Sequence, residues 1–164
     1  MDESRKQILK EAMAIEMTGR EFYRVTAEKT SDDKGRETFE FLATEEEKHF
    51  HLLQTWLLQV EQGELEPVVL SAPDTRPPSR IFSPEFVRRI GEKHFEMSAL
   101  SIGALLEKNS LEFYAKAAQD ASDPTEKRVF QELSTWETQH HQMLVKELES
   151  LQEVYWTTNR FAPF

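Results

Sequence analysis

The chain has 164 residues, of which 30 are acidic and 20 basic, so its formal net charge is −10. It has no cysteine, which excludes disulfides, zinc fingers and thiol chemistry. Nucleic acid and anionic membranes are not expected partners, because both attract a basic face. The N-terminus is charged where a signal peptide would be apolar, and no run approaches the roughly 20 apolar residues of a membrane span. We therefore expect a cytoplasmic protein that does not cross a membrane.

Four stretches of the sequence carry apolar residues at spacings of three and four, which is typical of amphipathic helices. They cover residues 8–27, 39–60, 100–118 and 130–151. The composition agrees, because 24 glutamates and only five glycines favour helix. The sequence therefore predicts an all-α fold with four long helices.

The connections between these helices differ in kind. Residues 31–35 have turn and N-cap composition, and Asp123 followed by Pro124 predicts an N-cap with proline at the first helical position. Both connections are short, so each helix pair is expected to fold as an antiparallel hairpin. Residues 62–83 show no helical period and predict a long crossover between helices two and three; four prolines lie in it, Pro67, Pro73, Pro77 and Pro78.

These elements predict a single four-helix bundle domain over residues 1–164. Its parts are a first hairpin at about 3–61, the crossover at 62–83, a second hairpin at about 84–153 and an aromatic tail at 154–164. Two separate domains are the alternative, but each hairpin alone would leave an apolar face unburied. We expect the tail to dock on the bundle or on a second subunit, in a homodimer.

The two halves of the chain repeat each other. Residues 13–53 align with 104–144 at a constant offset of 91, without a gap. Core packing explains the repeated apolar residues, but it does not explain repeated charged residues inside apolar stripes. These pairs are Glu16/Glu107, Glu46/Glu137 and His49/His140.

The spacing of these charged residues indicates one common layer. In each Glu-x-x-His pair the two side chains share a helix face, because residues three apart lie on the same side. With hairpin turns at about residues 31 and 122, each of the four glutamates lies 15 residues from its own turn. Equal distance from the turn means equal height in antiparallel helices, so all four glutamates can meet.

Four carboxylates cannot be buried together without compensation, because desolvation and mutual repulsion are costly. Two divalent cations would cancel their charge, and one Glu from each of two helices plus Glu-x-x-His from the other two is the ligand set of di-iron and di-manganese bundles. Oxygen-rich ligation with two imidazoles suits iron or manganese. The predicted metal ligands are Glu16, Glu46, His49, Glu107, Glu137 and His140.

At this point the sequence resembles the ferritin-like di-iron carboxylate proteins of the rubrerythrin type. The resemblance covers nearly the whole chain, in segments such as AIEMTGREFY, FEFLATEEEKHFHLL, LLEKNSLEFY and FQELSTWETQHHQML. It implies a ferritin-like bundle with two iron ions, or manganese in their place, and bridging roles for Glu46 and Glu137. It also implies that Tyr23 and Tyr114 lie near the metal pair, where their hydroxyls can bond ligand carboxylates.

The sequence departs from the rubrerythrin pattern at two points. Ser110 stands where these proteins carry a further glutamate, and no cysteine is present for a rubredoxin domain. A redox cycle is therefore expected to need an external electron donor. Only a short segment follows the fourth helix, which disfavours a storage cage with its fifth helix.

The leading hypothesis is an oxidoreductase that reduces peroxide or dioxygen at a dinuclear iron site. One alternative is a ferroxidase or iron-handling protein, with iron as its substrate. Another is a non-enzymatic helical bundle that binds a protein partner through its acidic face and aromatic tail.

Other residues are expected to serve packing or the surface. His51, His94 and His141 have no repeat partner and are predicted to be surface or packing histidines. Glu45 is predicted to lie on the polar flank of the second helix. Trp136 is predicted to anchor the core or an interface.

Overall fold

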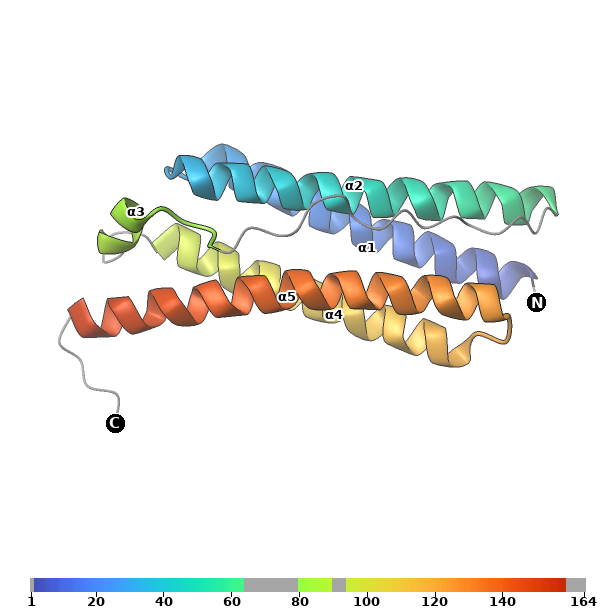
Figure 1. Ribbon diagram of the computed structural model, residues 1–164. Coiled ribbons are helices and arrows are strands. Elements are labelled where there is room, and N and C mark those ends of the chain that lie inside the picture. Colours follow the sequence, from blue (N-terminus) through green and yellow to red (C-terminus); the bar gives the residue numbers. More distant parts are fainter. Residues whose placement is uncertain (1, 64–79, 90–93, 159–164) are drawn as a thin grey trace.

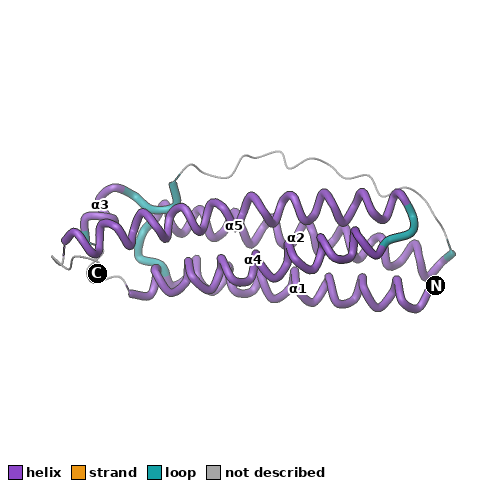
Figure 2. Tube along the Cα trace, turned by 90° about the horizontal axis from the view of Figure 1, so that it is seen from below, coloured by secondary structure: helices purple, strands orange, loops and turns teal. Residues whose placement is uncertain are grey.

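The computed structural model describes residues 2–63, 80–89 and 94–158. Within these residues the chain forms five helices and no strand: α1 (Asp2–Lys29), α2 (Asp33–Gln62), α3 (Pro84–Arg88), α4 (His94–Asp120) and α5 (Pro124–Thr158). The four long helices lie alongside one another, and the short α3 lies at one end of the bundle (Figures 1 and 2). The predicted all-α four-helix bundle of two hairpins is confirmed.

The two hairpins turn at opposite ends of the bundle, as Figure 1 shows. Helices α2 and α4 therefore run in the same direction, which is the arrangement that a long crossover serves. Most of the predicted crossover, residues 64–79, lies outside the described residues. Because each long helix has roughly 30 residues, a position 15 residues from either turn lies near mid-height.

The second hairpin differs in detail from its predicted bounds. The structure begins it with the separate helix α3, and α4 starts at His94. Helix α5 continues to Thr158, into the predicted aromatic tail, where Trp156 is 47% exposed. The remainder of that tail, residues 159–164, lies outside the described part of the chain.

Two aspartates that are partners in the 91-residue repeat begin the second helix of each hairpin. The Asp32 carboxylate accepts a hydrogen bond from the Gly35 backbone N–H at 2.9 Å. The Asp123 carboxylate accepts from the backbone N–H groups of Thr125 and Glu126, both at 2.9 Å. These bonds satisfy amides that have no partner within the helix, and they confirm the predicted N-cap at Asp123.

Asp32 also holds the segment that leads into α3. The Ser83 backbone N–H donates to Asp32 Oδ2 at 3.1 Å, and the Ser83 hydroxyl donates to Oδ1. This contact places the buried Phe82 ring against Gly35, where an added Cβ would lie 2.6 Å from a ring carbon. Close approach of the aromatic ring to the α2 backbone therefore requires glycine at position 35.

Gly35→Ala is expected to destabilise the protein by about 1–3 kcal/mol, because the new methyl group overlaps a fully buried ring. This loss exceeds the gain of about 1 kcal/mol in helix propensity from glycine to alanine. Urea unfolding followed by circular dichroism measures the change. Glu37→Ala, at an exposed position on the same helix, serves as the control and should shift stability by less than about 0.5 kcal/mol. Unchanged or raised stability of Gly35→Ala would contradict this packing.

The core consists of two apolar clusters, one toward each end of the bundle. One contains Leu9, Leu53, Trp56 and Phe130, and the other contains Phe39, Leu42, Phe82, Leu100 and Leu144. The predicted metal ligands lie in sequence between the residues of the two clusters. Apolar side chains therefore cover the layer of predicted ligands (the ligand layer) from above and below. None of the described helices is long and apolar enough to cross a membrane.

Candidate metal centre

The structure brings all six predicted metal ligands together at mid-height. Each of the four long helices contributes, and the exposed fraction of the six side chains lies between 0% and 5%. The lone glutamates come from α1 and α4, and the Glu-x-x-His pairs come from α2 and α5. The residues are Glu16, Glu46, His49, Glu107, Glu137 and His140.

The six side chains form two overlapping groups of four, each able to hold one cation. One group contains Glu16 and His49, and the other contains Glu107 and His140. Both groups also contain Glu46 and Glu137, and within each group the ligand atoms lie within 4.8 Å of one another. Glu46 and Glu137 would therefore be shared if both groups held a cation.

The imidazoles face carboxylates from both hairpins. His49 Nδ1 lies 2.9 Å from Glu137 Oε1 and 3.3 Å from Glu16 Oε2. His140 Nδ1 lies 3.5 Å from Glu46 Oε1 and 3.8 Å from Glu107 Oε2. Each half of the site thus combines ligands from the first and the second hairpin.

The polar atoms of this layer are poorly satisfied by the protein. Among the described residues, seven buried side-chain nitrogen or oxygen atoms have no hydrogen-bond partner, and five of these belong to the six clustered side chains. They include both carboxylate oxygens of Glu137 and Nδ1 of His140. Unsatisfied buried acceptors are costly, so the donor set fits a pair of divalent cations better than it fits protein alone.

The pKa values of the clustered carboxylates also indicate that the layer lacks compensating positive charge. Burial, followed by repulsion from neighbouring carboxylates, raises the pKa of Glu46 and of Glu137 well above the ordinary value of 4.5. Burial alone would also raise the pKa of Glu107. Interaction with the neighbouring Glu137 and His140, together with the hydrogen bond from Tyr23, outweighs burial there and lowers the pKa of Glu107 to about 2. Without cations, the raised pKa values favour the protonated forms of Glu46 and Glu137.

Two buried tyrosines hold the lone glutamates in a reciprocal arrangement. The Tyr23 hydroxyl of α1 donates to Glu107 Oε1 on α4, and the Tyr114 hydroxyl of α4 donates to Glu16 Oε1 on α1. Burial, and then the adjacent carboxylates, raise the pKa of both phenols well above 10, so they remain hydrogen-bond donors. Each tyrosine engages one carboxylate oxygen and leaves the other directed to the cluster.

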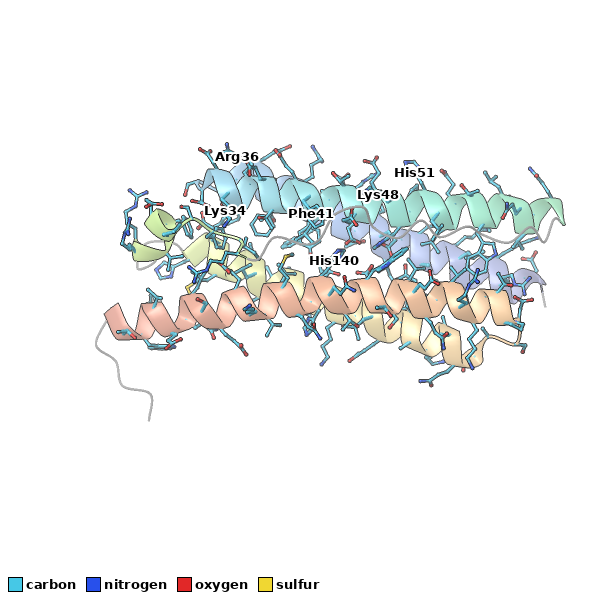
Figure 3. The ribbon with its side chains drawn as sticks, viewed as in Figure 1. Lys34, Arg36, Phe41, Lys48, His51 and His140 are labelled. Carbon is cyan, nitrogen blue, oxygen red and sulfur yellow. The ribbon has the colours of Figure 1, made fainter. Side chains whose placement is uncertain are left out.

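Aromatic rings flank the two imidazoles. Trp136 stacks on His49 with ring centroids 5.2 Å apart and planes 11° from parallel. The ring centroids of Phe41 on α2 and His140 on α5 are 6.5 Å apart, in an edge-to-face arrangement. Both residues are labelled in Figure 3. Trp136 was expected only as an anchor, but the structure places it directly against a predicted ligand.

Glu45 is a buried residue whose environment the sequence pattern missed. It was predicted on the polar flank of its helix, yet its exposed fraction is 3%. Its carboxylate pairs with Lys48 Nζ at 2.7 Å, and its charge contributes to the raised pKa of Glu137. The repeat contains a signal of this burial. At the offset of 91 residues, the position that matches Glu45 in the second hairpin is occupied by the large aromatic residue Trp136.

The remaining histidines lie outside the cluster. His141 contacts the Ala104 carbonyl oxygen through Nδ1 at 2.9 Å, which is a packing role. His51 is exposed and points away from the bundle in Figure 3, and His94 is also exposed. These positions agree with the predicted surface and packing roles.

A pocket of about 270 Å³ lies between α1 and α4 and reaches Glu46 and Glu107. Its inner end is next to Gly19 and Ser110, which are partners in the repeat and follow the lone glutamates by one turn. A Cβ at position 19 would lie 3.2 Å from Glu46 Oε2, and Ser110 is 6% exposed. Small residues at these two positions leave room for the pocket to reach the buried Glu46 and Glu107.

Comparisons with known proteins agree with this geometry. The family model described as Rubrerythrin matches residues 7–148. A solved structure titled "Hypothetical Protein Pfu-1136390-001 From Pyrococcus furiosus" is similar at 27% sequence identity and a TM-score of 0.66, covering 91% of this chain and 90% of that one. No curated protein matches. The matched family model spans all four ligand-bearing helices, and the chain belongs to the rubrerythrin family, with its ferritin-like fold.

Proposed function

We propose that this protein is an oxidoreductase that reduces peroxide or dioxygen at a dinuclear iron site. The observation that carries the proposal is the pair of overlapping buried ligand groups that share Glu46 and Glu137. Glu16 and His49 would complete the first metal position. Glu107 and His140 would complete the second. When bound, the metal pair would supply two electrons, one from each ion, and polarise the O–O bond.

The protein's own residues would prepare this chemistry. Tyr23 and Tyr114 keep their protons and hold Oε1 of Glu107 and of Glu16, so that the second oxygen of each carboxylate faces the cluster. The apolar clusters above and below the layer exclude water and strengthen electrostatic interactions inside it. The pocket between α1 and α4 provides access for the oxidant.

Reduction of one peroxide consumes two electrons and two protons. The sequence has no cysteine for a second, thiolate-bound redox centre, so the proposal includes an external electron donor. A homodimer and a cytoplasmic location, both expected from the sequence, stay predictions. Sedimentation of the purified protein tests the homodimer.

Anaerobic titration with Fe(II) is expected to saturate at two ions per chain. Stopped-flow spectroscopy of the reduced, loaded protein should then show oxidation by hydrogen peroxide well ahead of dioxygen, with one peroxide consumed per iron pair. Oxidation in this stoichiometry follows from the loss of one electron per ion.

Two other outcomes would contradict the proposal. Accumulation of ferric iron far beyond two ions per chain would indicate an iron-handling protein. Absence of any metal-dependent absorbance would indicate a helical bundle without metal chemistry.

A further inference from the structure

The pocket between α1 and α4 is larger than the oxidants considered so far require. Its volume is about 270 Å³, whereas one water occupies about 30 Å³ in the liquid. An apolar cavity of about 150 Å³ is large enough to bind benzene. Hydrogen peroxide and dioxygen, with two heavy atoms each, would therefore fill only a small part of this space.

The walls of the pocket combine apolar side chains with two buried glutamates and with the polar residues Thr18, Asn109 and Ser110. Ala14 and Ile15 of α1 and Leu106 of α4 supply apolar surface, while the buried Glu46 and Glu107 bring the pocket to the ligand cluster. A small molecule with one polar and one apolar end matches this division. Its polar end would lie at the ligand cluster and its apolar end against Ile15 and Leu106.

Two exposed apolar side chains of α4 lie close in sequence to the residues of the pocket wall. Ile102 and Leu105 are 49% and 57% exposed, and they share one side of α4 with the wall residues Leu106 and Asn109 at helical spacing. Burial of such surface by an organic group is favourable by about 25 cal/mol per Å². The apolar wall residues Ile15 and Leu106 therefore favour an organic molecule over a purely polar oxidant.

We propose that this pocket binds the organic group of an alkyl or aryl hydroperoxide and presents its peroxide group to the ligand cluster. The inference rests on the proposed function and names its substrate class. The O–O bond of ROOH breaks, and two electrons and two protons convert it to ROH and water. The electrons are those that the external donor supplies, and the protons come from solvent.

Thr18→Trp tests the pocket, because Thr18 is an exposed residue of its α1 wall and the larger side chain would fill it. Thr44→Trp is a matched control. Both threonines are exposed, and each donates its hydroxyl to the carbonyl four residues earlier, at 2.8 Å for Thr18 and 2.9 Å for Thr44. Thr44 lies on α2, outside the residues that line the pocket.

The first readout is binding of 2-phenylpropan-2-ol, the alcohol product of cumene hydroperoxide, measured by ligand-observed NMR. It uses the metal-free protein and the zinc-loaded protein, in which no electron transfer occurs. Thr18→Trp is expected to raise the Kd of the alcohol at least tenfold, and Thr44→Trp to leave it unchanged. If Thr18→Trp fails to fold, Asn109→Trp on the opposite wall is expected to give the same result. No binding to the unmodified protein would overturn the inference.

The second readout is the ratio of kcat/KM for cumene hydroperoxide to that for hydrogen peroxide, with the iron-loaded protein. Thr18→Trp should lower this ratio at least tenfold. A protein that reduces hydrogen peroxide with an unchanged ratio would overturn the inference while the proposed function stands. A protein that reduces neither peroxide but binds the alcohol would overturn the proposed function and the substrate class together. Light scattering gives the mass of the protein in solution. If Thr18→Trp changes this mass and leaves alcohol binding intact, the pocket region is an interface between copies of the chain and the inference is wrong.

Discussion

Replacement of both Glu46 and Glu137 with alanine is expected to abolish metal binding. Each of these carboxylates belongs to both groups of ligand atoms, so its loss weakens two metal positions at once. A single Glu46→Ala or Glu137→Ala change should weaken binding of both ions by more than about 100-fold, beyond the 10–100-fold typical of residues that only support ligands. Glu16→Ala, which removes a ligand of one group, should weaken one position more than the other.

Anaerobic Fe(II) titration with metal analysis measures these effects, and circular dichroism verifies that the variants remain helical. Glu21→Ala and Glu112→Ala are matched controls, because they are glutamates repeated at the same offset whose side chains are 46% and 60% exposed. Both controls should retain two ions per chain. Two ions in the Glu46→Ala, Glu137→Ala double variant would disprove the ligand assignment.

The metal-free protein is expected to lose stability as the pH rises above about 4.5. The pKa values of Glu46 and Glu137 are raised on folding, so above 4.5 the folded protein binds more protons than the unfolded chain, and stability falls with pH until the folded pKa values are passed. The lowered pKa of Glu107, about 2, acts in the opposite sense but only as the pH falls below 4.5.

Metal loading should reverse this dependence, because cations bind the deprotonated carboxylates and compete with protons. At free metal about 100 times the Kd, each ion contributes about 2.7 kcal/mol, so two ions raise stability by about 5 kcal/mol and the Tm by about 10–20 °C. Thermal unfolding at pH 5–8, with and without Zn(II), measures both effects. In the Glu46→Gln, Glu137→Gln double variant, the fall of metal-free stability with pH should largely disappear. A metal-free wild-type Tm that rises over this range would contradict the assignment.

The convergence of the six predicted ligand residues could be predicted from sequence because its information is local and repeated. Helical spacing places a glutamate and a histidine on one face, and the offset of 91 residues marks the same positions in both hairpins. The cap at Asp123 was predictable for a similar reason, since capping depends on a few adjacent residues.

Other features depend on contacts between distant segments. Helix α3 has five residues, too few to show a period, and its position follows from Ser83 and Phe82 meeting Asp32 and Gly35. Burial of Glu45 depends on the neighbouring helix. The pocket depends on the separation of α1 and α4, which no spacing along one helix reveals.

Both hairpins contribute to each half of the candidate site, so metal affinity would depend on how the two hairpins dock. Neither hairpin alone carries a complete group of four ligands, because Glu137 is needed beside Glu16 and His49, and Glu46 beside Glu107 and His140. The covalent link between the hairpins sets the effective concentration at which the two halves meet. Were that link cut, metal affinity would become dependent on protein concentration, and the cations would act as the agent that joins two separate chains.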